Sequence, residues 1–216
     1  MAKGSFISLE AILGIIFALI IIVPIVLLVS NFTSTSGQAT DNFQEFTGAL
    51  ESMSHSENTD DRKSHLLIMD DLTMITYFTD RMINVQVDTT ATTLSSYSIY
   101  IERPAACTKT PCICLIQEAE VETIPAQSSV KVSPLKSTCN ELTYTVSYKA
   151  GDNQCGIGES TNGASYTCSG GWFIDRGLIK DELLVSAYFS VQRRTPLILG
   201  PIEDGVQFAQ TRKELK

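Results

Sequence analysis

The stretch of 19 residues from Ala11 to Val29 (AILGIIFALIIIVPIVLLV) carries no charged side chain. As an α-helix this stretch would be about 28 Å long, close to the ~30 Å hydrocarbon core of a bilayer. In lipid the backbone has to satisfy its own hydrogen bonds, so we expect a helix here. Gly14 is tolerated in such a helix, and Pro24 removes one hydrogen bond and is expected to bend it. The sequence therefore predicts a membrane-inserted N-terminal segment followed by a polar region.

Three kinds of segment share this apolar character. A secretory signal peptide has an apolar core of about 7–15 residues and a small-residue cleavage site, whereas this run is longer and ends in the poor site Val29-Ser-Asn-Phe32. An uncleaved anchor with Lys3 on the cytoplasmic side fits the positive-inside rule. The third interpretation depends on Glu10, because a carboxylate at the start of a membrane helix is costly and usually has a partner and a function.

The residues before the apolar run are Lys3-Gly4-Ser5 and then Phe6 to Glu10 (FISLE). This order resembles the class III signal peptide of type IV pilins, particularly that of archaeal pilin-like proteins. In that family a membrane peptidase cuts before the apolar run, and a glutamate is the fifth residue of the mature chain. Cleavage after Ser5 makes Phe6 the first residue and Glu10 the fifth, whereas cleavage after Gly4 makes Glu10 the sixth. Bacterial members nearly always have glycine before the cut, so Ser5 favours an archaeal source.

The resemblance covers about thirty residues of the chain and implies a domain organisation. Residues 1–5 would be a leader removed at the processing site Gly4, Ser5 and Phe6, and residues 6–30 would form a membrane and filament-core helix. Residues 31–54 would continue this helix in amphipathic form, and residues 55–216 would form an extracellular head. The new α-amino group of Phe6 would pair with the Glu10 carboxylate of its own or a neighbouring subunit during assembly. The implied partners are the membrane, a prepilin-type peptidase and identical subunits in a homo-polymer.

Apolar residues recur at alternating steps of four and three beyond the membrane segment. This spacing is typical of a helix, and only Ser36 interrupts it. The members are Ile25, Val29, Phe32, Ser36, Ala39, Phe43, Phe46, Leu50 and Met53. Three-residue steps from Leu66 to Phe78 predict a second helix over Ser64–Ile83.

Alternation of apolar and polar residues between turn-rich stretches indicates antiparallel strands in the rest of the chain. These strands are expected at Ser96–Glu102, Ile113–Glu122, Ser128–Ser133, Leu142–Tyr148 and Leu184–Gln192. Asp204–Lys216 is a charged tail for which a helix is one option. The predicted fold class is therefore α+β, with a long N-terminal hydrophobic α-helix followed by a β-rich, antiparallel head domain.

All six cysteines lie in the predicted head, which indicates disulfides formed outside a reducing cytosol. Six cysteines allow 15 connectivities, and the sequence does not choose among them. Cys112 and Cys114 are two apart on a predicted strand, so both face one side and should bond elsewhere, and Cys155 and Cys168 could close the glycine-rich loop between them. Zinc is the alternative, but the spacing C-x₄-C-x-C departs from paired C-x₂₋₄-C ligands. The possible disulfide residues are Cys107, Cys112, Cys114, Cys139, Cys155 and Cys168.

No motif of hydrolases, metalloproteases, P-loop proteins or dinucleotide-binding enzymes occurs in the chain, so we predict no enzyme activity, cofactor or metal. The net charge of −8 argues against nucleic acid as a partner. Asn31 in Asn31-Phe-Thr33 is a possible glycosylation site. The predicted function is a structural subunit of a type IV pilus-like filament on the cell surface, with adhesion or another interaction through the head. The alternative is a membrane-anchored extracellular binding domain that does not polymerise.

Overall fold

The computed structural model describes residues 37–88, 96–125, 128–149, 155, 165–179 and 194–210. The chain divides into two compact units, Met1–Gln38 and Ala39–Lys216, and nearly all the described residues belong to the second. The described residues form a helix at 37–54 and eleven strands. The predicted leader, the apolar run, the outer helix up to residue 36 and the strand at 184–192 lie outside the described residues.

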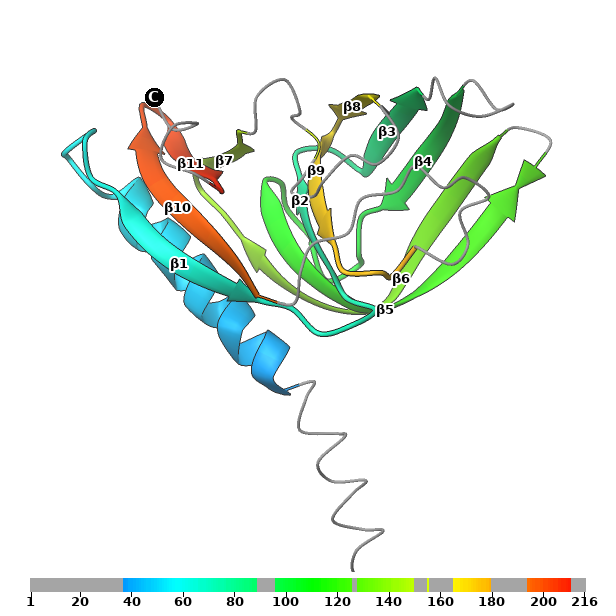
Figure 1. Cartoon of the computed structure of the whole chain (residues 1–216), viewed down its shortest axis with the longest axis horizontal. Coiled ribbons are helices and arrows are strands. Elements are labelled where there is room, and N and C mark those ends of the chain that lie inside the picture. Colours follow the sequence, from blue (N-terminus) through cyan, green and yellow to red (C-terminus); the bar gives the residue numbers. More distant parts are fainter. Residues whose placement is uncertain are drawn as a thin grey trace, which may run out of the picture. The chain divides into compact units, whose positions relative to one another are not determined.

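The strands of the second unit form two sheets (Figure 1). The four-stranded sheet has the order β1 (Lys63–Ile68), β10 (Arg194–Ile202), β11 (Gly205–Ala209) and β7 (Thr145–Tyr148). The seven-stranded sheet has the order β8 (Ser165–Ser169), β3 (Met82–Asp88), β4 (Ser96–Glu102), β6 (Ser129–Glu141), β5 (Cys112–Ile124), β2 (Met74–Phe78) and β9 (Gly171–Asp175). Most neighbours are antiparallel, but β11 pairs with β7 and β4 pairs with β6 in parallel.

The seven-stranded sheet curls back on itself because two of its strands continue into two others. β2 runs into β3 through residues 79–81, and β8 runs into β9 through Gly170 alone. Since β2 pairs with β9 and β3 pairs with β8, these four strands form one kinked antiparallel ribbon. One half of the ribbon joins β5 and the other half joins β4, and both β5 and β4 pair with β6. The sheet is therefore nearly closed on itself, and the continuity of the chain from β2 to β3 and from β8 to β9 joins its two ends.

The kink in the ribbon requires two glycines. Gly170 and Gly171 have φ angles of +78° and +142°. A Cβ at Gly170 would lie 2.1 Å from the carbonyl oxygen of Met82, and one at Gly171 would lie 1.8 Å from that of Tyr77. Only a residue without a side chain permits such an approach of two backbones.

Two hydrophobic clusters lie on opposite faces of β2, β5 and β9. The inner cluster lies within the curl of the seven-stranded sheet and contains Met74, Phe78, Ile83, Val85, Val87, Tyr97, Ile99, Ile101, Cys107, Cys112, Cys114, Ile116, Val130, Val132, Cys155, Phe173 and Ile179. The helix cluster lies between that sheet, the four-stranded sheet and the helix. It contains Ala39, Phe43, Phe46, Ala49, Leu50, Met53, Leu67, Met69, Ile75, Tyr77, Ile113, Leu115, Val146, Tyr148, Trp172, Ile174, Leu197, Leu199, Val206 and Phe208. On β2, Met74 and Phe78 belong to the inner cluster and Ile75 and Tyr77 to the helix cluster, and every residue of this strand is buried.

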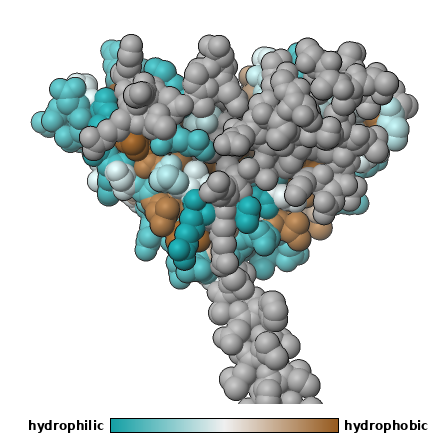
Figure 2. Space-filling model, in the orientation of Figure 1, coloured by the Kyte–Doolittle hydropathy of each residue, from teal (hydrophilic) through white to brown (hydrophobic). Residues whose placement is uncertain are grey.

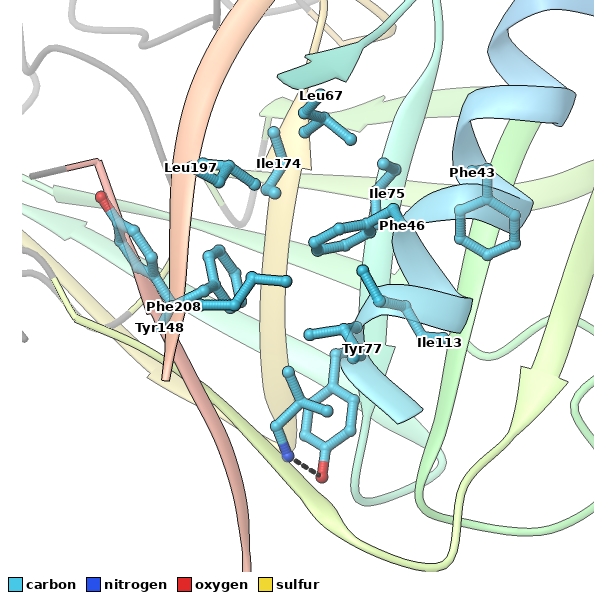
Figure 3. Close-up of a cluster of buried hydrophobic side chains, with 14 of the residues drawn as sticks. Phe43, Phe46, Leu67, Ile75, Tyr77, Ile113, Tyr148, Ile174, Leu197 and Phe208 are labelled. Atoms are coloured by element: carbon cyan, nitrogen blue, oxygen red, sulfur yellow. Dashed lines mark hydrogen bonds between the residues drawn. The ribbon is translucent and has the colours of Figure 1, made fainter. Parts of the chain in front are cut away.

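The helix contributes one apolar side to the helix cluster (Figure 3). Ala39, Phe43, Phe46, Leu50 and Met53 are all buried, as the spacing of the predicted stripe requires. The ring of Phe46 lies 6.0 Å from that of Phe208 in an edge-on arrangement, which joins the helix to β11.

Side chains from other elements form hydrogen bonds with the backbone of both outer strands of the four-stranded sheet, β1 and β7. The Asn42 amide donates to the carbonyl oxygen of Leu66 over 3.0 Å and accepts from the N–H of Ile68 over 2.7 Å, both on β1. On β7, the N–H of Val146 donates to the Tyr77 hydroxyl over 3.1 Å, and Trp172 Nε1 donates to the Val146 carbonyl over 2.8 Å. These bonds satisfy backbone groups that would otherwise invite pairing with another chain.

The predicted α+β fold class is wrong, because the described residues are mostly strands and include one short helix. The predicted second helix at 64–83 is instead β1, β2 and the start of β3, and part of the predicted tail is β11. The three-residue steps were misleading because both faces of β2 are buried, which hides the alternation of a strand. The strand at Ser96–Glu102 is confirmed with its exact bounds. Among the described residues, no helix combines the length and apolar character needed to cross a bilayer.

Candidate functional site

The six cysteines form three disulfides: Cys107–Cys112, Cys114–Cys139 and Cys155–Cys168. Cys114 and Cys139 lie directly opposite each other on antiparallel β5 and β6, with their Cα atoms 4.1 Å apart. As predicted, Cys112 and Cys114 share one face and bond elsewhere, and Cys155 bonds to Cys168. All three bridges lie in or against the inner cluster.

The sulfur atoms of Cys107, Cys112 and Cys114 gather in one buried place. The Sγ atoms of Cys112 and Cys114 are 3.9 Å apart, and all three sulfurs lie within 4.8 Å of one another. A thiolate site for zinc needs these sulfurs to be reduced and free. Each sulfur is instead bonded within a disulfide, so this cluster is a covalent staple of the core.

A groove of about 470 Å³ lies between the helix and the end of β6 with the loop that follows it. Its ten lining residues are Gln44, Thr47, Gly48 and Glu51 from the helix and Cys139, Asn140, Glu141, Leu142, Thr143 and Tyr144 from the other wall. The volume is within the range of about 300–1,000 Å³ that small-molecule sites occupy. Most of the lining is polar, and the Asn140 amide donates to the Thr47 hydroxyl over 2.9 Å, which links the two walls.

The local contacts set the charge of this groove. The Glu141 carboxylate accepts hydrogen bonds from the Thr108 hydroxyl and, over 3.1 Å, from the N–H of Lys109. These bonds, that of Thr108 first, hold the pKa of Glu141 below its usual value and keep the carboxylate ionised. Burial raises the pKa of Tyr144 to about 12, with a smaller contribution from the charge of Glu51, so this phenol stays neutral.

Outside the groove, the most strongly perturbed carboxyl belongs to Asp175 at the end of β9. Burial raises its pKa to about 7, although backbone N–H groups bond to it. Gly177 donates to it over 2.9 Å and Leu178 over 3.0 Å. Asp175 therefore organises the turn that follows β9.

The sequence-predicted site residues fall into two groups. Gly4, Ser5, Phe6, Glu10 and Asn31 lie outside the described residues. The six cysteines are all paired. Trp172 lies in the helix cluster and stacks on Tyr77 with ring centroids 5.5 Å apart. Sequence reasoning missed the groove, and a glycine within an otherwise regular helical pattern, Gly48, was the available signal.

No known family model matches this chain, and comparisons with curated proteins and with solved structures give no match either.

Proposed function

We propose that this chain is a structural subunit of an extracellular, type IV pilus-like filament, with its disulfide-bonded β-rich unit displayed at the surface. The observation that carries the extracellular part is the pairing of all six cysteines in three disulfides. Disulfides of this kind form and persist in oxidising compartments and are rare in the cytosol. The uncharged run from Ala11 to Val29 supplies a segment that can bring such a unit to the membrane.

The assembly part rests on the order of Gly4-Ser5, Phe6 and Glu10 before the apolar run. The edges of the four-stranded sheet give indirect support for assembly through the N-terminal segment. Because Asn42, Tyr77 and Trp172 bond to the outer strands of the four-stranded sheet, addition of a strand from another subunit at these positions would break existing bonds. Assembly through an apolar N-terminal segment avoids that cost.

Phe6 and Glu10 have a defined role in this proposal. Burial in a filament removes water from the Glu10 carboxylate, which then needs a cation. The α-amino group that cleavage creates on Phe6 is the nearest one. Breaking a buried pair typically costs about 3–5 kcal/mol because one charge is left unpaired.

The test is electron microscopy of filaments from cells that express this chain together with a prepilin-type peptidase. The native chain should begin at Phe6 by intact mass and appear in filaments. Glu10→Ala should be inserted and cleaved but give few or no filaments, whereas Glu118→Ala, on an exposed strand position, should assemble normally. An uncleaved N-terminus and no filaments would favour the alternative, a tethered binding domain. Normal filaments with Glu10→Ala would refute the pairing role.

A further inference from the structure

Gly48 has no conformational or packing requirement that explains it. It lies in the middle of the helix at 37–54, where glycine is less favourable than alanine by about 1 kcal/mol. A Cβ added at Gly48 would meet nothing within 4 Å, in contrast to Gly170 and Gly171. What a glycine provides at this position is space, because Gly48 forms part of the groove wall.

The two charged side chains that line the groove are both acidic, and the cation that acts on one of them, Lys109 near Glu141, lies outside the lining. Glu51 lies on the helix wall and Glu141 on the other wall, and the ten lining residues include no lysine or arginine. The described helix also carries Asp41 and Glu45 and has no basic residue. An occupant with a positive charge would therefore be attracted from several directions.

The polar groups of the groove suit an ammonium group. A lysine ammonium has three donors and no acceptor. The residues that line the groove include two carboxylates, Glu51 and Glu141, and two side-chain amides, Gln44 and Asn140, and all four side chains carry acceptor oxygens. Thr108 and Lys109 bond to Oε1 of Glu141 and so fix this carboxylate before any ligand arrives.

A metal ion fits this groove poorly. Calcium takes six to eight oxygen ligands that converge on one point. The groove lining contains two carboxylates, and among the described residues the only group of three or more His, Cys, Asp or Glu side chains placed to hold a metal ion is the cysteine cluster. The groove is open to solvent on one side, and a side chain that is still attached to a protein chain can enter it.

We propose that the groove between the helix and the loop after β6 is a docking site for a lysine-bearing segment of a partner protein. The lysine stem enters the space beside Gly48, and its ammonium group binds between Glu51 and Glu141. This proposal concerns the β-rich unit and does not depend on filament formation.

The experiment uses the full chain in a non-ionic detergent and a fluorescein-labelled heptapeptide with two lysines in a glycine-serine background. Fluorescence anisotropy should report binding that weakens as salt is added. The same peptide with both lysines acetylated should not bind, because it has lost its charge.

Three variants locate the binding. Gly48→Met fills the space beside the glycine and should abolish binding, while its higher helix propensity keeps the helix intact. Glu51→Gln should weaken binding about fivefold, a typical effect for one partly exposed ion pair. Glu45→Gln is the matched control, because Glu45 interacts with His65 on the β1 side of the helix and its loss should change binding less than about twofold.

Three outcomes would overturn the proposal. The first is no anisotropy change with the lysine peptide, and the second is equal binding of the acetylated peptide. The third is an equal loss with Glu45→Gln and Glu51→Gln, which would mean diffuse attraction to an acidic surface. If Gly48→Met fails to fold, the two glutamine variants still decide the question.

Discussion

The inner cluster and the helix cluster are both hydrophobic cores, but different interactions hold the elements around them together. The inner cluster is mainly aliphatic and is closed by covalent bonds, since all three disulfides lie in or against it. The helix cluster contains no cysteine and is closed by aromatic contacts and by side chains that bond to strand edges. Within it, the ring of Trp172 lies 4.9 Å from that of Phe208 and stacks on Tyr77.

This difference follows from what surrounds each cluster. Among the described residues, the inner cluster is enclosed by a single curled sheet, and no second described sheet or helix packs over it from within (Figure 1). Bridges between neighbouring strands and loops therefore supply its cross-links. The helix cluster lies between two sheets and a helix, so large aromatic side chains from several elements meet there.

On the face drawn in Figure 2, the surface of the described residues is mostly hydrophilic and carries scattered hydrophobic patches.

The two clusters share strands β2, β5 and β9, whose successive residues point to opposite sides. Ile113 and Leu115 belong to the helix cluster, whereas Cys112, Cys114 and Ile116 belong to the inner cluster. A change on one side is therefore transmitted to the other by one rigid strand. We expect the two clusters to unfold together.

Reduction of all three disulfides should have the largest effect. Each bridge contributes about 2–4 kcal/mol to the free energy of unfolding, so their joint loss exceeds the stability of many domains. Urea denaturation with and without a reductant, followed by the fluorescence of Trp172, measures the effect. Trp172 is the single tryptophan and lies in the helix cluster, so an unchanged midpoint would mean that the two clusters are independent.

Phe46→Ala should lower the free energy of unfolding by about 3–5 kcal/mol. The Phe46 side chain is fully buried and contacts Phe208, so its removal leaves a cavity between the helix and β11. Ile101→Ala, a fully buried position of the inner cluster, should cost about 2–5 kcal/mol and is the comparison. If Phe46→Ala were nearly neutral in urea denaturation, the helix would not be a structural part of the core.

Asp175→Asn should change how the free energy of unfolding depends on pH, because Asp175 is a buried carboxyl group on β9, one of the strands that the two clusters share. Burial raises the pKa of Asp175 to about 7 from 3.8, so the folded state binds this proton more tightly than the unfolded state. Its contribution to stability is complete below about pH 4 and is lost as the pH rises through about 7, with a slope of up to about 1.4 kcal/mol per pH unit.

Urea midpoints measured from pH 4 to pH 8 should show this decline in the native chain and a flatter profile in Asp175→Asn. A rise of stability across this range that disappears in the variant would show that the N–H bonds of Gly177 and Leu178 outweigh the burial.

Asn42→Ala should have the smallest effect of the four, about 1–3 kcal/mol. It removes the amide that bonds to Leu66 and Ile68 and leaves these backbone groups on β1 without that partner. Tyr77→Phe does the same for the N–H of Val146 on β7. Asn42→Ala should also associate more readily in light scattering, since it uncovers part of the β1 edge, whereas Tyr77→Phe leaves the buried Val146 covered and should stay monodisperse. An Asn42→Ala variant as stable and as monodisperse as the native chain, or a Tyr77→Phe variant as stable as the native chain, would contradict the role assigned to these side chains.

Local patterns predicted some elements of this protein well. β4 alternates buried and half-exposed residues and was predicted with its exact bounds, because one face of that strand meets solvent. The buried side of the helix followed from the four-and-three spacing of Phe43, Phe46 and Leu50. β2 was missed, because burial on both faces removes the alternation that identifies a strand. The groove was also missed, since its two walls are separated by about ninety residues of sequence, from Gln44–Glu51 to Cys139–Tyr144.

The sequence by itself determined the properties that depend on single residues and their near neighbours. These are the uncharged run from Ala11 to Val29, the even set of six cysteines, the apolar side of the helix and the alternation in β4. Only the tertiary structure decided which cysteines pair, which strands are buried on both faces and where the chain kinks, at Gly170 and Gly171. The physical reason is that these properties depend on contacts between residues far apart in the chain, and no local pattern records which distant backbone or sulfur atom will lie opposite.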